Sequence, residues 1–323
     1  MSFVKKILLY FKNPHFLSLI GTGFNSFIGL ATFGLLYRAL SQKEIGIYLI
    51  FTVVLNLIDT VKAGLLTGAF ITFFSGSEPA RAKNVSGSTW GLALLITGAL
   101  MVINLFTYLC SGYVADRSIA LIFTFFSIVS LSTLPSFMGN LAVQGERRFD
   151  RLLWVNLTTQ VLFMATVIIL MALKKSSLMN VVYTLIATNA LASLIILSLG
   201  WTKIENLKHA TRKTILEIFH FGKYSFGTSL SANLFRVTDN FFLSYYLGPA
   251  AVAIYNLGVK LNQVVEIPLL SLATSGAPVL ASHYNHDEDY SVIYVMRKMI
   301  GMLTIPFILL AFVSVIFANP MTK

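Results

Sequence analysis

Long apolar stretches, separated by short polar segments, recur along the whole chain. A transmembrane helix needs about 20 mostly apolar residues to cross roughly 30 Å of hydrocarbon. Nine stretches reach that length: 15–37, 45–73, 88–110, 118–141, 152–173, 178–200, 221–247, 250–280 and 298–318. The pattern predicts an all-α fold, a polytopic transmembrane helix bundle with almost nothing outside the bilayer that could fold separately.

Composition supports a membrane protein. Hydrophobic residues make up 56% of the chain and charged residues only 11%, whereas soluble domains carry about 25% charged residues. The first apolar stretch is longer than the core of about 7 to 15 residues found in signal peptides, so we expect it to remain as a helix. Cys110 has no partner cysteine in the chain, so no internal disulfide is expected.

The longest polar segment, 201–220, predicts a division of the chain into lobes. Its sequence continues into ENLKHATRKTILEIFHFGK, which has the pattern of a basic amphipathic segment lying along a membrane surface. We predict a first lobe of six helices over 1–200, a cytoplasmic linker over 201–220, and a partial second lobe of about three helices over 221–323.

A weak internal repeat supports this division. The segments YRALSQKEIGIY (37–48) and SYYLGPAAVAIY (244–255) align at an offset of 207 residues. Each is predicted to end one long helix, turn, and begin another. Duplicated bundles are how many transporters build alternating access around a central site, although a repeat in a purely structural bundle stays open as an alternative.

Positive charges predict the orientation. With the N-terminus inside, the inner segments hold 15 of the 24 Lys and Arg residues and the outer segments hold six. Lys and Arg gather on the cytoplasmic side of membrane proteins, so the N-terminus and the loops at 75–87, 142–151 and 201–220 are predicted to be cytoplasmic. Nucleic acid is excluded as a partner, because the net charge of +11 is spread over short loops with no fold to array it.

Several segments together resemble a known family. They are YRALSQKEIGIYLI (37–50), AVQGERRF (142–149) and the run from FGKYSFG to LGVKL (221–261). In order and spacing they resemble the polysaccharide and oligosaccharide flippases (Wzx-type) of the multidrug/oligosaccharidyl-lipid/polysaccharide exporter superfamily. The resemblance implies transport of an undecaprenyl-pyrophosphate-linked oligosaccharide, such as an O-antigen unit of lipopolysaccharide, across a bacterial inner membrane by two helix bundles that flank a cavity.

The resemblance also implies binding partners, and the chain differs from the family in its length. The expected partners are the lipid-linked oligosaccharide, membrane lipid, and the polymerase and glycosyltransferases of the same polysaccharide. Members of the family continue into further helices beyond the nine predicted here, so we expect a C-terminally truncated chain. Expressed alone, it is expected to be poorly stable or to recruit another membrane protein, and to be inactive in transport.

Ionisable residues inside the predicted spans indicate a polar interior. They are Asp59, Lys62, Arg236, Asp239, Lys260 and Glu266. A charge at the bilayer centre costs at least about 2.5 to 3.5 kcal/mol, so such residues normally face a partner or water. Polar residues share helix faces with them, and the resulting candidate substrate-binding set is Asn25, Asp59, Lys62, Asn233, Arg236, Asp239, Asn240 and Lys260.

Two interpretations of these residues stay open. In the first, Arg236, Lys62 and Lys260 present cations to the pyrophosphate, since guanidinium and ammonium groups suit phosphate oxygens. In the second, the pairs Asp59 with Lys62 and Arg236 with Asp239, each three residues apart, neutralise one another and join helices. The two lysines could also extend towards an interface.

Signatures of enzymes are missing from the sequence. It contains no GxxxxGK[ST], HExxH, GxSxG or paired CxxC. The cluster SHYNHDEDY (282–290) is interpreted as a solvated loop, without a metal. We therefore predict no catalytic residues, no metal and no cofactor. The alternatives to a flippase are a drug or cation antiporter of the same superfamily, a membrane-embedded glycosyl- or acyltransferase, and a transport-inactive fragment.

Overall fold

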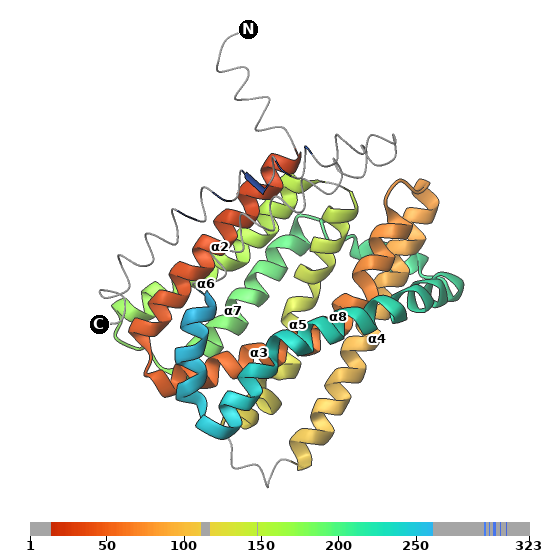
Figure 1. Cartoon of the computed structure of the whole chain (residues 1–323). Helices are drawn as coiled ribbons and strands as arrows, with labels where there is room; N and C mark the ends of the chain where they lie inside the picture. Colours follow the sequence, from red (N-terminus) through yellow and green to blue (C-terminus); the bar gives the residue numbers. More distant parts are fainter. Residues whose placement is uncertain are drawn as a thin grey trace. The chain divides into compact units, whose positions relative to one another are not determined.

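The computed structural model describes residues 14–110, 117–146 and 148–260, with isolated positions between 294 and 308. All regular structure in these residues is helical (Figure 1). The helices are α2 (Pro14–Ala39), α3 (Gln42–Phe74), α4 (Pro79–Cys110), α5 (Arg117–Gly145), α6 (Phe149–Ala172), α7 (Leu178–Ser198), the short 3-10 helix η2 (Ile204–His209) and α8 (Arg212–Leu247). A further helical segment covers 249–260. The predicted all-α polytopic bundle is confirmed.

The chain forms two compact units, and each is described by itself. One unit comprises 27–255; the other comprises 1–26 together with 256–323. Almost all the described helices lie in the first unit. The second contains the first part of α2 and the residues that follow Tyr255.

The long helix α3 forms the centre of the unit 27–255. It packs against α4, α5, α7 and α8. One apolar cluster surrounds Phe51 in the first half of α3, and a second surrounds Leu66 and Phe70 in the second half, where Trp90 of α4 joins it. Both clusters include residues of α3, so this helix holds its neighbours in place.

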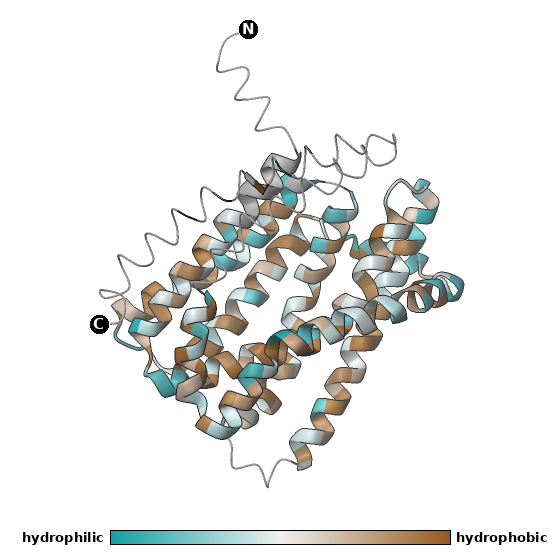
Figure 2. Cartoon of the chain, in the orientation of Figure 1, coloured by the Kyte–Doolittle hydropathy of each residue, from teal (hydrophilic) through white to brown (hydrophobic). Residues whose placement is uncertain are grey.

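Among the helices that the structure describes, five are long and apolar enough to cross a membrane: α3, α4, α5, α6 and α7. The last four carry exposed large apolar side chains; on α4, Phe106 is 66% exposed and Leu109 is 71% exposed. Figure 2 shows this part of α4 mainly in brown and white, with few hydrophilic positions. Such a surface fits contact with lipid, because hydrocarbon replaces water around the bundle.

Side-chain caps mark where several helices begin. Ser41 and Glu44 form a reciprocal capping box at the start of α3, and Ser177 caps α7. Thr211 accepts a hydrogen bond from the backbone N–H of Thr214 and so starts α8. Serine and threonine at this position satisfy backbone donors that the first helical turn leaves free.

Two helices begin before the apolar stretches that predicted them. The segment predicted as a linker, 201–220, contains η2 and then the first turns of α8, which begins at Arg212. Likewise α4 begins at Pro79, well before the predicted apolar start at 88. In both cases the polar first turns of a long helix lie outside the apolar stretch. The ninth predicted span (298–318), the cluster at 282–290 and most of 250–280 lie outside the continuous described ranges, and the two-lobe division stays a prediction.

Candidate functional site

The helices α3 and α8 approach each other closely along a face that bears glycine and serine. A Cβ added at Gly222 would overlap the backbone carbonyl of Leu65, and one added at Gly64 would lie 3.3 Å from the Cβ of Ser229. A Cβ at Gly68 would lie 3.4 Å from Ser225 Oγ. Ser225 and Ser229 therefore pack against α3, where small residues permit close helix contact.

The predicted pair Asp59 and Lys62 forms on α3. Lys62 Nζ lies 3.0 Å from Asp59 Oδ1 and 5.4 Å from the centre of the Phe137 ring on α5. The Lys62 side chain is 2% exposed, whereas that of Asp59 is 38% exposed. Lys62 therefore lies inside the helix packing and does not extend towards an interface. Lys62 and Asp59 therefore form the ion pair that the second interpretation of these residues predicts.

The environment of Lys62 has a further feature. Its ammonium forms the ion pair, but it has no well-aligned hydrogen bond among the described residues. A buried cation of this kind depends strongly on its counter-charge, because desolvation of an ammonium is expensive. We infer that Asp59 is a structural requirement for α3, whatever else it contacts.

On α8, the polar residues do not form the second predicted pair. Asp239 accepts a 2.6 Å hydrogen bond from the hydroxyl of Tyr255, which lies beyond the turn that ends the helix. Asn233 donates to the carbonyl of Ser229 in its own helix at 3.0 Å. Within the described ranges, no ion pair joins Arg236 to Asp239, and the Arg236 side chain is exposed. Arg236 is thus an exposed cation without an ion pair in the second half of α8.

The remaining predicted site residues occupy different places. Asn240 is buried and has interaction partners. Asn25 and Lys260 belong to the other compact unit, and Lys260 also has a partner in the chain. Glu266 lies outside the described residues. A single interior shared by all eight candidate residues stays a prediction, whereas the contact of α3 with α8 brings two of the predicted polar helices together.

The two segments of the internal repeat have the predicted form and contact each other. The first joins α2 to α3 through two residues, and the second joins α8 to the helical segment at 249–260. The Tyr37 hydroxyl donates to the carbonyl of Ala253, and a Cβ at Gly46 would overlap the backbone of Pro249. Two helix–turn–helix junctions therefore meet at one end of the unit.

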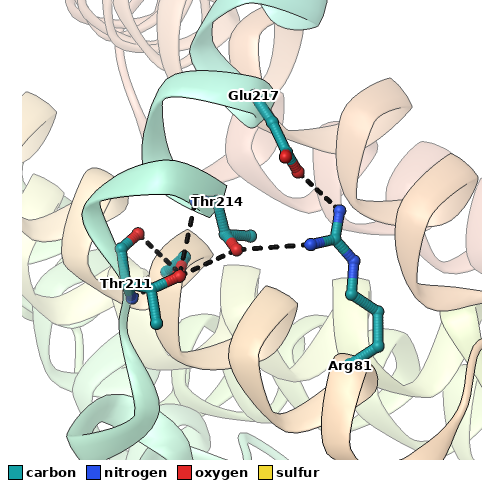
Figure 3. Close-up of polar contacts among 5 residues, drawn as sticks. Arg81, Thr211, Thr214 and Glu217 are labelled. Carbon is teal, nitrogen blue, oxygen red and sulfur yellow. Dashed lines mark hydrogen bonds and ion pairs between the residues drawn. The ribbon is translucent and has the colours of Figure 1, made fainter.

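A polar network that the sequence did not reveal lies where α8 begins (Figure 3). Arg81 of α4 points towards α8 and forms a 2.5 Å ion pair with Glu217. Its guanidinium also lies 3.5 Å from Thr214 Oγ1, and Thr211 bonds in turn to Ser88 of α4. These contacts attach the first turns of α8 to α4. Their partners are far apart in the sequence, so no local pattern signals them.

The loops predicted to be cytoplasmic all lie at this end. Lys203 forms a 3.1 Å ion pair with Glu146 in the loop between α5 and α6. Ser75, at the end of α3, donates to the carbonyl of Gly145 at 3.0 Å. The pKa of Arg148, in the same loop, is raised by a hydrogen bond to Asp150. These contacts place the three loops on one side, as their shared charge predicts, although the direction in the membrane stays a prediction.

No group of three His, Cys, Asp or Glu residues that could hold a metal occurs in the part of the chain that the structure describes. The candidate site is therefore the polar surface of α3 and α8. It offers the exposed guanidinium of Arg236, together with amides and hydroxyls, and these groups can bind an anion and sugar hydroxyl groups.

Solved structures with a similar fold include MATE proteins and another transporter of the MOP superfamily. An inward-facing MATE family transporter of the MOP superfamily matches with a TM-score of 0.71 and 16% identity, over 91% of this chain and 70% of that chain. A MATE protein in complex with MaL6 gives a TM-score of 0.65 and 16% identity, over 95% and 73%. A MOP superfamily transporter from Pyrococcus furiosus gives 0.61 and 16%, over 95% and 72%. The chain therefore shares the fold of these transporters.

The sequence specifies the family further. Residues 35–323 match the polysaccharide biosynthesis protein family, and the chain belongs to it. The resemblance to Wzx-type flippases is thereby confirmed at the level of the family. A comparison of the sequence with curated proteins finds no match.

Proposed function

We propose that this protein is a flippase that moves a lipid-linked oligosaccharide, carried on undecaprenyl pyrophosphate, from the inner to the outer leaflet of a bacterial inner membrane. Membership of a polysaccharide biosynthesis family supports a saccharide cargo. The MATE-like fold supports transport by conformational change instead of an enzymatic step. The proposed orientation has the N-terminus and the end that carries Arg81 in the cytoplasm.

The observation that carries the proposal is the state of the charged groups on α3 and α8. Asp59 is paired with Lys62, and Asp239 accepts from Tyr255. Arg236, in the second half of α8, is exposed and has no ion pair among the described residues. The site therefore has bonded carboxylates and an accessible guanidinium. It suits a pyrophosphate, because guanidinium groups bind phosphate oxygens through two parallel hydrogen bonds.

The second candidate is a drug or cation antiporter. It is favoured by the MATE structures, which are described as multidrug resistance transporters. A cationic cargo requires accessible carboxylates at the site. The carboxylates of Asp59 and Asp239 are at least partly exposed, but the first is paired with Lys62 and the second accepts a hydrogen bond from Tyr255. For the Pyrococcus furiosus transporter, a reversed polarity of the binding pocket suggests a different function, so polarity is a reasonable criterion for distinguishing members of this fold.

The choice between the two candidates is tested by binding to the purified protein in lipid nanodiscs. The probes are undecaprenyl pyrophosphate carrying a saccharide, undecaprenol without phosphate, and the cationic dye ethidium. We expect the pyrophosphate lipid to bind at least about tenfold more tightly than undecaprenol and to resist displacement by ethidium. Tight ethidium binding that the pyrophosphate lipid does not displace would support the antiporter.

A further inference from the structure

A shallow groove of about 670 Å³ runs along the first turns of α8, outside the surface just described. Phe73, near the end of α3, and Leu216, Phe221 and Tyr224 of α8 provide its apolar lining. The rings of Phe73 and Phe221 pack edge to face at 5.5 Å. Tyr224 is 68% exposed and Leu216 is 56% exposed. The groove therefore offers apolar surface to its surroundings.

Two lysines and a histidine border the same groove. Lys213 and His220 are part of its lining. Lys223 lies 4.8 Å above the Tyr224 ring, and its Nζ is 3.4 Å from His220 Nε2. Glu217, the acidic residue of the lining, is already paired with Arg81 at 2.5 Å. The groove consequently presents a net positive rim beside an apolar floor.

The position of the groove suits the edge of a bilayer. It lies at the end of the unit where the loops around Ser75, Gly145 and Lys203 meet. Aromatic side chains are enriched at the level of lipid headgroups, and lysines near helix ends direct their charge to the same level. The apolar floor would be costly to expose to water, but at this depth acyl chains cover it.

We propose that this groove binds an anionic phospholipid of the bilayer, with an acyl chain on the aromatic floor and the anionic headgroup at the rim, where Lys213 and Lys223 supply the positive charge. Charge complementarity and the adjacent apolar floor together favour a lipid over a soluble anion, which would gain nothing from Phe73, Phe221 or Tyr224. Basic pockets at the cytoplasmic ends of transmembrane helices bind anionic headgroups for the same reason. The bound lipid would anchor the start of α8, beside the Arg81–Glu217 ion pair.

The site does not depend on the proposed transport function. It is formed by the outer side of α8 near its beginning, whereas Arg236 lies about 18 Å of helix beyond Tyr224, at roughly 1.5 Å per residue. Loss of lipid binding at the groove and loss of pyrophosphate binding at Arg236 can therefore be measured separately in the same protein.

The experiment is native mass spectrometry of the purified protein with dioleoyl-phosphatidylglycerol and, separately, dioleoyl-phosphatidylcholine. We expect selective retention of phosphatidylglycerol, and about a tenfold or greater loss of that preference in the double variant Lys213→Gln, Lys223→Gln. The double variant with arginine at both positions should keep it. The matched control is Lys83→Gln, Lys208→Gln, which removes two exposed lysines at the same end but outside the groove lining.

Three results would overturn the proposal. The first is equal retention of the two lipids by the unmodified protein. The second is an unchanged preference in the glutamine variant, or an equal loss in the control. The third is displacement of phosphatidylglycerol by millimolar inorganic phosphate, which would assign the cations to a soluble anion. Because all four lysines are exposed, the variants should unfold at the temperature of the parent protein.

Discussion

The helices α3 and α8 share one contact face but differ in how they manage charge. On α3 the cation Lys62 is buried, and its counter-charge, Asp59, lies about one helical turn away. On α8 the cation Arg236 is exposed. The carboxylate nearest to it in sequence, that of Asp239, accepts a hydrogen bond from Tyr255 instead. In addition, α3 meets the length and apolarity expected of a membrane span, whereas α8 is longer but does not.

This difference separates structural charges from charges that are open to a ligand. A paired and buried lysine holds α3 in its packing, and removal of its partner would leave an uncompensated charge in an apolar environment. An exposed arginine on a polar helix contributes little to the packing. The two predicted cations, Lys62 and Arg236, therefore have different roles despite their similar sequence context.

The largest stability effect is expected for Asp59→Asn. The substitution keeps the shape of the side chain but leaves the Lys62 ammonium buried without a counter-charge, so the unfolding free energy should fall by about 3–5 kcal/mol. Lys62→Met should cost less, because the Asp59 carboxylate left behind is partly exposed. Thermal unfolding in detergent, followed by circular dichroism, measures both.

The double variant Asp59→Asn, Lys62→Met is the control for this pair. With both charges removed it should recover most of the stability that Asp59→Asn loses. If Asp59→Asn alone unfolds at the parent temperature, Lys62 is not held by Asp59, and the contrast between α3 and α8 fails.

A smaller effect is expected at the contact face itself, from Gly222→Ala on α8. The new methyl group would meet the Leu65 backbone, so we expect a loss of about 1–3 kcal/mol. Gly227→Ala is the matched control on the same helix, since no heavy atom lies within 4 Å of its added Cβ. That variant should gain roughly 0.5–1 kcal/mol from helix propensity. Changes of equal sign in the two variants would argue against a close α3–α8 contact.

The smallest effect is expected where α8 is attached to α4. Arg81→Ala should cost about 1 kcal/mol, because both partners of the ion pair are roughly one-third exposed and water screens their interaction. Reversal of the pair, Arg81→Glu with Glu217→Arg, should restore part of the loss. Lys83→Ala, at a neighbouring exposed lysine, should have no measurable effect. A cost for Lys83→Ala as large as that for Arg81→Ala would rule out a specific ion pair.

The sequence was sufficient to predict the bundle and most of its helices, because apolar runs of membrane length are an unambiguous signal. It was insufficient for the start of α8. The residues from Arg212 to His220 are too polar to count as a span, yet they form helix because Thr211 caps them and Ile218 is buried beneath them. Hydropathy reports where a chain meets lipid, and it does not report where a helix begins.

For the candidate site, spacing along one helix predicted what lies within that helix and little else. The Asp59–Lys62 pair was visible because its partners are three residues apart. The hydrogen bond from Tyr255 to Asp239 crosses a turn, and the Phe137 ring that covers Lys62 comes from another helix. Contacts between helices depend on tertiary packing, and no local pattern in a single sequence indicates them.

The proposed binding of the pyrophosphate by Arg236 is tested most directly by measuring the affinity of the purified protein for undecaprenyl pyrophosphate in nanodiscs. Arg236→Ala should weaken binding at least about tenfold, and Arg236→Lys should keep part of it, because a lysine retains the charge but loses the paired hydrogen bonds. Lys174→Ala, at an exposed lysine in the turn between α6 and α7, should bind as the parent does. Unchanged affinity in Arg236→Ala, in a protein of parental stability, would contradict the proposed role of Arg236.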